Sequence, residues 1–374
     1  MSERQRERER GPEPQERVHD YDWNEARAER WALESRLFQE RPRVIRYDAV
    51  PWEQVQQAYH KIYTGDNLPD IPRKLRRAPI FTMSARLQVI ETGHKSGNHR
   101  HYHEAVFYVL AGRGHDVHDG RRYDWEPGDL MIVPGYCAHQ HFCDDGPTTL
   151  FYVLGDLAPN VGLGAMEQLE LNARFKLPPG ARFLYDDRGE VTGYRRKDGT
   201  DILFREYAIG QEAMASRRTI APPRHEATDS YEYYARLFEE EVHLRQSVPH
   251  VIKPRDCTWE DTRNGRVMWL CHPARPTGIR TYEVYVQELA PGRRSGKHRH
   301  VGEEVHYIID GKGYTVIDDE TWEWQAGDVV AIPVCSTHQS FNADPRHPAR
   351  FVAVKSAIYD FMGFGGIEHL EDAA

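Results

Sequence analysis

An internal repeat is the feature of this sequence that most constrains its fold. A shift of 199 residues places residues 93–143 on residues 292–342 without a gap, and 20 of the 51 paired positions are identical. Chance does not produce agreement of this length, so the chain carries two copies of one structural unit. Two such units fit the length of 374 residues, which is typical of a two-domain protein.

Each copy of the repeat has the pattern of an all-β domain. In the first copy, short apolar runs at 85–91, 105–110 and 130–133 are separated by turns that contain Gly or Pro. Matching G-x-G turns stand at 112–114 and 311–313. Many short strands with regular turns are typical of a β-sandwich or a small β-barrel. The sequence therefore predicts two all-β domains, at residues 76–160 and 256–360.

The N-terminal part of the chain has a different composition. Residues 1–18 alternate Arg and Glu and predict a disordered tail, because they offer almost nothing apolar to bury. Residues 19–75 predict a helical N-terminal segment. Its first helix is capped by Asn24 and ends before Pro42, and a second helix follows Pro51. The apolar residues at helical spacing in that second helix are Val55, Ala58, Tyr59 and Ile62.

Two further segments complete the predicted organisation. Residues 161–255 form a mixed linker that contains a helix, and residues 361–374 form a C-terminal tail. Within the linker, Tyr231, Tyr234 and Phe238 share one helical face, which predicts a helix packed on that side.

The second copy contains a set of residues suited to bind a metal ion. His298 and His300 are separated by one residue, so on a strand both imidazoles lie on the same face. Glu304 follows four residues later, and His338 comes from a later strand. Three imidazoles and one carboxylate suit a divalent transition metal with open positions, such as Fe(II), Mn(II), Ni(II) or Zn(II).

The first copy offers a related but not identical set. His99, His101 and His139 stand at the three histidine positions, whereas Ala105 replaces the carboxylate. The neighbouring Glu104 pairs with Glu303 in the repeat, so it is expected to point away from the site. Loss of the carboxylate makes this site more positive and more open. A three-histidine Fe(II) site would keep positions for substrate oxygens and O₂.

Further histidines lie near the first set in the sequence. His141 and His103 are candidates for handling a proton or orienting a substrate. An ordinary hydrogen-bonded histidine is the alternative for His141. Solvent-facing strand positions are the alternative for His103 and also for His115 and His118. Arg100 and Arg299 alternate away from the ligand face, so structural salt bridges are expected for them.

The spacing of the ligands resembles that of a known superfamily. The pattern G-x5-H-x-H-x3-E-x6-G matches residues 292–311, and G-x5-P-x4-H-x3-N matches residues 327–342. These resemble the two signature motifs of the cupin superfamily. The resemblance implies a bicupin, in which two double-stranded β-helix (jelly-roll) barrels are accompanied by helical N-terminal and linker segments. Bicupins often associate, so the resemblance also implies a homo-oligomer.

A narrower resemblance lies in the first copy. Residues 87–114 and 126–141 resemble gentisate 1,2-dioxygenase, whose relatives include salicylate and 1-hydroxy-2-naphthoate dioxygenases. The resemblance implies that His99, His101 and His139 hold Fe(II) and that His141 lies near the substrate. It further implies a non-haem iron, extradiol-type dioxygenase that cleaves a hydroxylated aromatic acid with O₂. In that family the C-terminal cupin usually lacks metal ligands, whereas here it has all of them.

Two other functions remain open at this stage. The second barrel could carry decarboxylase-like or quercetinase-like chemistry, or the protein could be a metal-bearing binder of small molecules without activity.

The amino-acid composition limits the classes of partner that are expected for this protein. The 58 acidic residues outnumber the 49 basic ones, which argues against nucleic acid, and no apolar run approaches the roughly 18 residues of a membrane helix. Five cysteines are too few for a disulfide framework and fit a reducing, cytoplasmic compartment.

Overall fold

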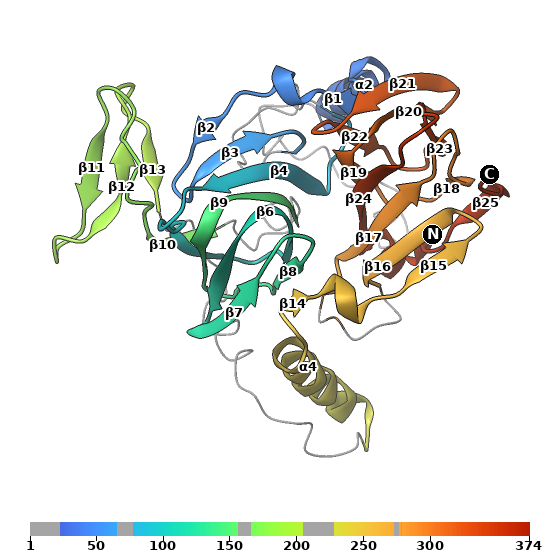
Figure 1. Cartoon of the computed structure of the whole chain (residues 1–374). Coiled ribbons are helices and arrows are strands. Elements are labelled where there is room, and N and C mark those ends of the chain that lie inside the picture. Colours follow the sequence, from blue (N-terminus) through green and yellow to red (C-terminus); the bar gives the residue numbers. More distant parts are fainter. Residues whose placement is uncertain (1–22, 66–77, 156–165, 205–227, 273–276, 278) are drawn as a thin grey trace, which may run out of the picture. The chain divides into compact units, whose positions relative to one another are not determined.

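The computed structural model describes residues 23–65, 78–155, 166–204, 228–272, 277 and 279–374 (Figure 1). It divides into a small unit, residues 1–41, and a large unit, residues 42–374. The predicted disordered tail at 1–18 lies outside the described residues. Among the described residues, no helix combines the length and the apolar character that a membrane span requires.

The described part of the small unit is one helix, α2 (Trp23–Glu40). It ends before Pro42, as predicted, but Asn24 lies within the helix and does not precede it. Ala, Glu, Arg and Leu favour the helical backbone, and Arg30 pairs with Glu34 one turn later at 3.1 Å.

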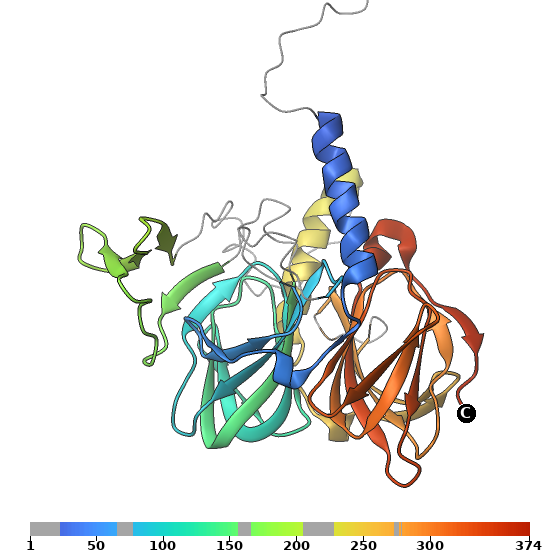
Figure 2. The ribbon, with the colours of Figure 1, turned by 90° about the horizontal axis from the view of Figure 1, so that it is seen from above.

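The large unit contains two β-barrels, which we call barrel 1 (residues 53–155) and barrel 2 (residues 259–356) (Figures 1 and 2). All strand pairs in both barrels are antiparallel. The all-β prediction is therefore confirmed. The strands of barrel 1 are β2 (Glu53–Gln54), β3 (Tyr59–Ile62), β4 (Met83–Ile90), β5 (Asn98–His101), β6 (Ala105–His118), β7 (Arg121–Trp125), β8 (Leu130–Val133) and β9 (His139–Gly155). Those of barrel 2 are β15 (Trp259–Thr262), β16 (Gly265–Cys271), β17 (Tyr282–Leu289), β18 (Lys297–Arg299), β19 (Glu304–Asp310), β20 (Lys312–Ile317), β21 (Glu320–Gln325), β22 (Val329–Ile332), β23 (His338–Asn342) and β24 (Ala349–Ser356).

The two barrels share one hydrophobic core. On β4, Met83, Ala85 and Leu87 belong to a buried cluster that also contains residues of β17, β19 and β24 in barrel 2. Phe151 of barrel 1 stacks on Tyr307 of barrel 2, with ring centroids 4.9 Å apart. Because side chains alternate along a strand, the intervening residues of β4 face the interior of barrel 1.

Each barrel receives a short strand from the segment that precedes the other barrel. β1 (Val44–Ile45) pairs with β22 of barrel 2, and β14 (Val251–Ile252) pairs with β8 of barrel 1. Arg46 then pairs with Asp328 at 2.8 Å, and Lys253 pairs with Asp129 at the equivalent turn of barrel 1. Short 3₁₀ turns follow both strands, η1 (Tyr47–Ala49) and η4 (Pro254–Asp256).

The prediction of a second helix in the N-terminal segment is wrong. The segment after Pro51 forms β2 and β3, and β3 pairs with β4. The apolar spacing over residues 55–62 imitates a helix, but pairing with β4 decides the structure. A wider search for the repeat would have indicated strands, because Val44-Ile45 and Trp52-Glu53 recur as Val251-Ile252 and Trp259-Glu260.

A pair of glutamates also links the barrels reciprocally. Glu104 of barrel 1 accepts hydrogen bonds from the backbone amides of Arg280 and Thr281 at 3.0 and 2.9 Å. Glu303 of barrel 2 accepts the equivalent bonds from Phe81 and Thr82 at 2.7 and 2.8 Å. Both carboxylates are buried, and both accept hydrogen bonds from the other barrel.

The predicted C-terminal tail is also corrected. A short helical turn, η5 (Asp360–Phe364), leads to β25 (Glu368–Glu371), which pairs with β18. In barrel 1, β10 (Met166–Glu170) pairs with β5 in the same way. The C-terminal residues therefore continue the sheet because they supply backbone partners for a strand that would otherwise be an edge.

The linker between the barrels contains a small sheet and a helix. The helix α4 (Ser230–Ser247) leaves Tyr231 and Tyr234 largely exposed, at 79% and 69%, so the predicted packing of that face is wrong for the described residues. Helical spacing predicts a shared face, but it does not show that another element covers it. The small sheet consists of β11 (Arg182–Tyr185), β12 (Val191–Arg195) and β13 (Asp201–Leu203).

Candidate metal centres

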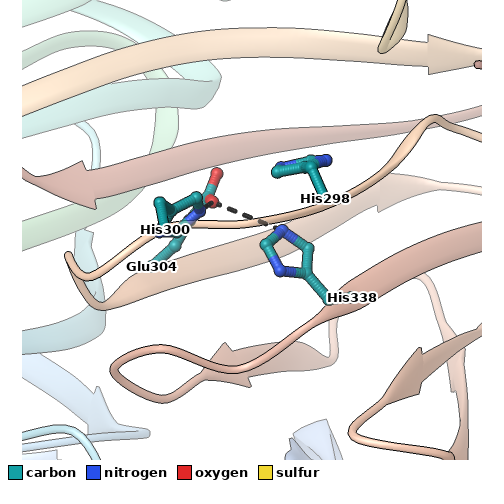
Figure 3. A group of neighbouring side chains, drawn as sticks. All are labelled: His298, His300, Glu304 and His338. Carbon is teal, nitrogen blue, oxygen red and sulfur yellow. Dashed lines mark hydrogen bonds and ion pairs between the residues drawn. The ribbon is translucent and has the colours of Figure 1, made fainter. Parts of the chain in front are cut away.

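Barrel 2 brings together the four predicted ligands of the second copy. His298 lies on β18 and His300 directly follows it, while Glu304 begins β19 and His338 begins β23 (Figure 3). All four side chains are buried, and their ligand atoms lie within 4.8 Å of one another. Glu304 Oε2 lies 2.8 Å from His300 Nε2 and 3.8 Å from His338 Nε2.

Barrel 1 brings together the three predicted histidines of the first copy. His99 and His101 lie on β5, and His139 begins β9 opposite His99. Their ligand atoms also lie within 4.8 Å of one another, and all three are buried. His139 Nε2 is buried and has no hydrogen-bond partner among the described residues.

Backbone carbonyls orient all six histidine rings in the same manner. In barrel 1, the Nδ1–H groups of His99, His101 and His139 donate to the carbonyls of residues 97, 103 and 137 at 3.3, 2.7 and 3.0 Å. In barrel 2, the corresponding distances for His298, His300 and His338 are 3.4, 2.7 and 3.2 Å. A carbonyl can only accept, so each ring donates through Nδ1, and a ring that is neutral keeps its lone pair on Nε2. This is the arrangement in which a protein holds histidine ligands for a metal.

The electrostatics of both sites agree with metal binding. Burial lowers the pKa of His101 and of His298 to about 4, and lowers the pKa of His99, His139 and His338 well below the usual value. These rings are therefore neutral at pH 7 and available as ligands. Both sets fit a divalent metal ion, because they present converging neutral nitrogens, joined in barrel 2 by one carboxylate.

Two of the pairs of equivalent positions at which the sites differ change the charge beside the predicted ligands. In barrel 2, the Tyr285 hydroxyl donates to Glu304 Oε1 at 2.6 Å. In barrel 1, Ala105 stands in place of Glu304, and Arg86 stands in place of Tyr285. Barrel 1 has thus lost a negative charge and gained a positive one.

Arg86 faces the interior of barrel 1. Its guanidinium contributes to the lowered pKa of both His60 and His103, after the larger effect of burial. Its Nε donates to Ser84 Oγ at 2.9 Å. Among the residues that the structure describes, no carboxylate forms an ion pair with Arg86.

Several other polar groups line the same interior. His60 Nδ1 lies 3.0 Å from the hydroxyl of Tyr152, while His60 Nε2 has no partner. Gln88 Nε2, His141 Nε2 and both ring nitrogens of His103 are also buried without partners in the described structure. Unpaired buried nitrogens are costly, so their concentration here indicates a site that a ligand or ordered water completes.

The structure decides between the alternatives for the remaining histidines. His103 is not solvent-facing, because its ring stacks on His101 with centroids 4.1 Å apart and interplanar angle 7°. His118 is fully buried, so the solvent-facing alternative is wrong for it as well. His141 is buried and hydrogen-bonded through Nδ1 to Asp116 at 2.8 Å, which still leaves its Nε2 facing inward.

Two predictions about charged neighbours are confirmed. Glu104 points away from the site, toward barrel 2. Arg100 and Arg299 form ion pairs with Glu167 and Glu368, each at 2.6 Å. Sequence reasoning missed His60, Arg86, Gln88 and Asp116. For Arg86, the available signal was its position opposite Tyr285 in the repeat.

Comparison with protein families identifies the repeated unit. The model of the cupin domain matches twice, at residues 86–154 and 285–355. Among solved structures, a mutant of oxalate decarboxylase from Bacillus subtilis covers 88% of this chain and 80% of its own, with a TM-score of 0.55 and 15% identity. At this identity the likeness concerns the fold.

Curated relatives are similar over a large part of this chain. A 1-hydroxy-2-naphthoate 1,2-dioxygenase from a Nocardioides species is 27% identical over 68% of this chain and 58% of its own length. A gentisate 1,2-dioxygenase from Aquipseudomonas alcaligenes is 23% identical over 67% of this chain and 64% of its own. The chain thus matches less than two thirds of the length of each. With two cupin domains in one chain, the protein is a bicupin of the cupin superfamily and resembles the aromatic-acid dioxygenases in sequence.

Proposed function

We propose that barrel 1 is the catalytic centre of an Fe(II)-dependent, ring-cleaving dioxygenase that acts on a hydroxylated aromatic acid with O₂. The observation that carries this proposal is a difference in sequence between the two barrels. Barrel 1 has Ala105 at the position of Glu304 and Arg86 at the position of Tyr285. A neutral three-histidine set beside a guanidinium that has no carboxylate partner among the described residues suits an anionic substrate. The printed names of the similar proteins, which are aromatic-acid 1,2-dioxygenases, support the same substrate class.

Each group in the interior of barrel 1 has a role in this proposal. His99, His101 and His139 would hold the ferrous ion, which when bound supplies the redox chemistry that O₂ needs to react with an organic ring. Arg86 binds the substrate carboxylate, because a guanidinium makes strong charge-assisted hydrogen bonds to carboxylates. His141 Nε2 accepts a hydrogen bond from the substrate hydroxyl. His103, whose ring nitrogens are buried beside His101, is a second group for orienting the substrate.

Apolar side chains provide the remaining surface that an aromatic ring requires. Phe107 and Tyr152 stack on each other with centroids 4.7 Å apart, and Phe107 also contacts the ring of His141 at 4.5 Å. Both side chains are buried, and in this proposal they face the substrate ring, where apolar surroundings strengthen the charged contacts.

Barrel 2 has a different part in this proposal. Tyr285 fixes one oxygen of Glu304, and His306 Nε2 lies 3.2 Å from the same oxygen. One carboxylate oxygen, Oε2, and three histidines would hold a supporting metal ion. A second candidate function, decarboxylase-like chemistry in barrel 2, is favoured by this complete three-His, one-Glu set.

Oxygen uptake tests the proposal. We expect anaerobically purified, Fe(II)-loaded protein to consume O₂ in a 1:1 ratio with at least one hydroxylated benzoate or naphthoate, and to cleave its ring. Phenols without a carboxylate should not be turned over. CO₂ release without O₂ uptake would move the chemistry to the decarboxylase class.

The contribution of Arg86 is tested separately. Arg86→Met should raise KM for the aromatic acid about 10- to 100-fold, since a hydrogen bond to a charged group is worth about 1.5–3 kcal/mol. Arg86→Lys should recover part of this loss. Arg122→Met is a matched control, because Arg122 belongs to the same barrel but is exposed. An unchanged KM in Arg86→Met would remove Arg86 from the substrate site.

A further inference from the structure

A series of buried, hydrogen-bonded side chains begins at His141 in barrel 1. Asp116 Oδ1 accepts from His141 Nδ1 at 2.8 Å and from Trp125 Nε1 at 2.9 Å. Asp116 Oδ2 lies 3.1 Å from His118 Nε2, and His118 Nδ1 lies 2.8 Å from Nδ1 of His250. The four histidine and aspartate side chains are all buried, with Asp116 at 0% exposure.

The hydrogen bonds of Asp116 fix the positions of the protons along this series. An ionised carboxylate only accepts, so His141 donates through Nδ1 and His118 donates through Nε2. With a neutral ring, His118 then accepts at Nδ1 from the Nδ1–H of His250. His141 therefore keeps its lone pair on Nε2, the atom that faces the interior without a partner.

The repeat provides an internal comparison for this series. Barrel 2 has Thr315, Ile317 and Ser340 at the positions of Asp116, His118 and His141. Thr315 Oγ1 pairs with Ser340 Oγ at 2.9 Å and accepts from Trp324 Nε1 at 3.0 Å, just as Asp116 accepts from Trp125. Barrel 2 thus folds around the equivalent tryptophan with two hydroxyl groups in place of the carboxylate and the imidazole of barrel 1.

A buried carboxylate is therefore not needed to build this part of the barrel. Burying a charge costs free energy unless every hydrogen bond of the charged group is made. The buried carboxylate of Asp116 in barrel 1 therefore indicates a role in the site of that barrel. The series also extends to the strand exchanged between the barrels. His250 immediately precedes β14, and its carbonyl accepts from the amide of Ile132 on β8 at 2.7 Å.

We infer that Asp116 is a positioning residue, which holds His141 with its Nε2 lone pair directed at the hydroxyl group of the substrate. His118 and His250 in turn hold Asp116 from the side of the exchanged strand. The identity of the substrate rests on the proposed function, whereas the orientation of the ring does not. The substrate feature that this device recognises is a hydroxyl adjacent to the carboxylate-bearing carbon.

Nitrogen NMR of histidine-labelled, metal-free protein tests the orientation directly. We expect His141 to be protonated on Nδ1, with its proton signal shifted downfield by the carboxylate, and Asp116→Asn to abolish that signal. Asp144→Asn is the matched control, because Asp144 forms an exposed pair with His115 at 2.7 Å on the same two strands. An unchanged His141 tautomer in Asp116→Asn would overturn the inference.

Binding of two probes tests the consequence for recognition. Wild-type Fe(II)-loaded protein, kept anaerobic, should bind 2-hydroxybenzoate at least about 10-fold more tightly than benzoate, and Asp116→Asn should lose this preference while its iron content stays the same. Loss of iron in Asp116→Asn, or an intact preference, would contradict the inference. If no aromatic acid is turned over, the proposed function fails while the tautomer measurement still decides the role of Asp116.

A double variant guards against a simple folding defect. Asp116→Thr combined with His141→Ser recreates the hydroxyl pair of barrel 2, which the repeat shows to be compatible with the fold. It should remain folded and bind iron but show no preference for 2-hydroxybenzoate. A retained preference would overturn the role of His141 and Asp116 together.

Discussion

At the scale of single residues, the difference between the two sites lies in the pair of positions around Arg86. In barrel 2 the carboxylate of Glu304 accepts from Tyr285 and lies 2.8 Å from His300 Nε2, whereas barrel 1 has Arg86 and Ala105 at the positions of Tyr285 and Glu304. Either set suits a divalent metal, so metal binding alone would not distinguish them. The charge next to the predicted ligands does distinguish the two sets, because a positive group there attracts an anionic substrate and a negative group repels it.

Ala105→Glu should therefore weaken the binding of the aromatic acid. The new carboxylate would pair with Arg86 or bind the metal, and in either case repel an anionic substrate. We expect KM to rise at least about 10-fold, measured by oxygen uptake. Glu304→Ala, the reverse change in barrel 2, is the matched control and should leave this KM unaltered. Equal KM values for Ala105→Glu and wild type would refute the role given to local charge.

The sequence predicted the ligand residues better than their surroundings. The H-x-H spacing and the repeat register were sufficient to predict the seven side chains that the structure brings together in two groups, because residues on adjacent strands recur at fixed spacings. His60 and Asp116 were not found, because they come from a segment predicted to be helical and from a strand whose partner could not be known. Only the pairing of the strands brings them beside His99 and His139.

At the scale of secondary-structure elements, the barrels are joined by exchanged strands and by two buried glutamates. Glu303 adjoins the ligand Glu304, and Glu104 adjoins Ala105. Each therefore anchors the start of a strand at the candidate metal site to the residues that immediately precede β4 or β17 of the other barrel. The strands of the repeat were predictable from their turns, but the exchange was not, because a two-residue strand has no periodicity to detect.

Replacing either glutamate by glutamine should destabilise the protein. At Glu303 the amide keeps one acceptor but turns its NH₂ group toward a backbone N–H, because Phe81 and Thr82 donate to different oxygens. At Glu104 both backbone amides donate to Oε2, so glutamine replaces a charged acceptor by a weaker neutral one. We expect Glu303→Gln and Glu104→Gln each to lower the free energy of unfolding by about 1–3 kcal/mol, measured by urea denaturation. Glu320→Gln, at an exposed position on β21, serves as the control. Losses below about 0.5 kcal/mol would show that the glutamates contribute little to joining the barrels.

At the scale of the whole molecule, the buried neutral histidines should make the metal-free protein sensitive to acid. His101 and His298 have a pKa of about 4 when folded, against about 6.5 when unfolded. As the pH falls from 6.5 to 4, the unfolded chain therefore binds protons that the folded chain does not. The free energy of unfolding should decrease by up to about 1.4 kcal/mol per pH unit for each such histidine.

Urea unfolding of metal-free protein at pH 7.5, 6.0 and 5.0 measures this dependence. We expect stability to be nearly constant above pH 7 and to fall steadily below 6.5. His101→Asn should reduce the slope, because it removes one of the groups. Constant stability between pH 7.5 and 5.0 would contradict the neutral, buried state of these rings.

Removal of the metal should destabilise the folded chain. A ligand that binds only the folded state adds about 2.7 kcal/mol when present at 100 times its Kd. We expect chelation to lower Tm by several degrees, and His298→Ala to abolish part of this difference. An identical Tm with and without metal would speak against a bound ion in either barrel. Association into a homo-oligomer remains a prediction, which light scattering would measure.

The assignment of catalysis to barrel 1 is tested most directly by oxygen uptake in two matched variants. His139 and His338 occupy equivalent positions, each at the start of its strand and each with a neutral, buried ring. With Fe(II) and a hydroxylated aromatic acid, we expect His139→Ala to abolish O₂ consumption and His338→Ala to retain most of it. Retained uptake in His139→Ala together with loss in His338→Ala would place the chemistry in barrel 2 and contradict the account.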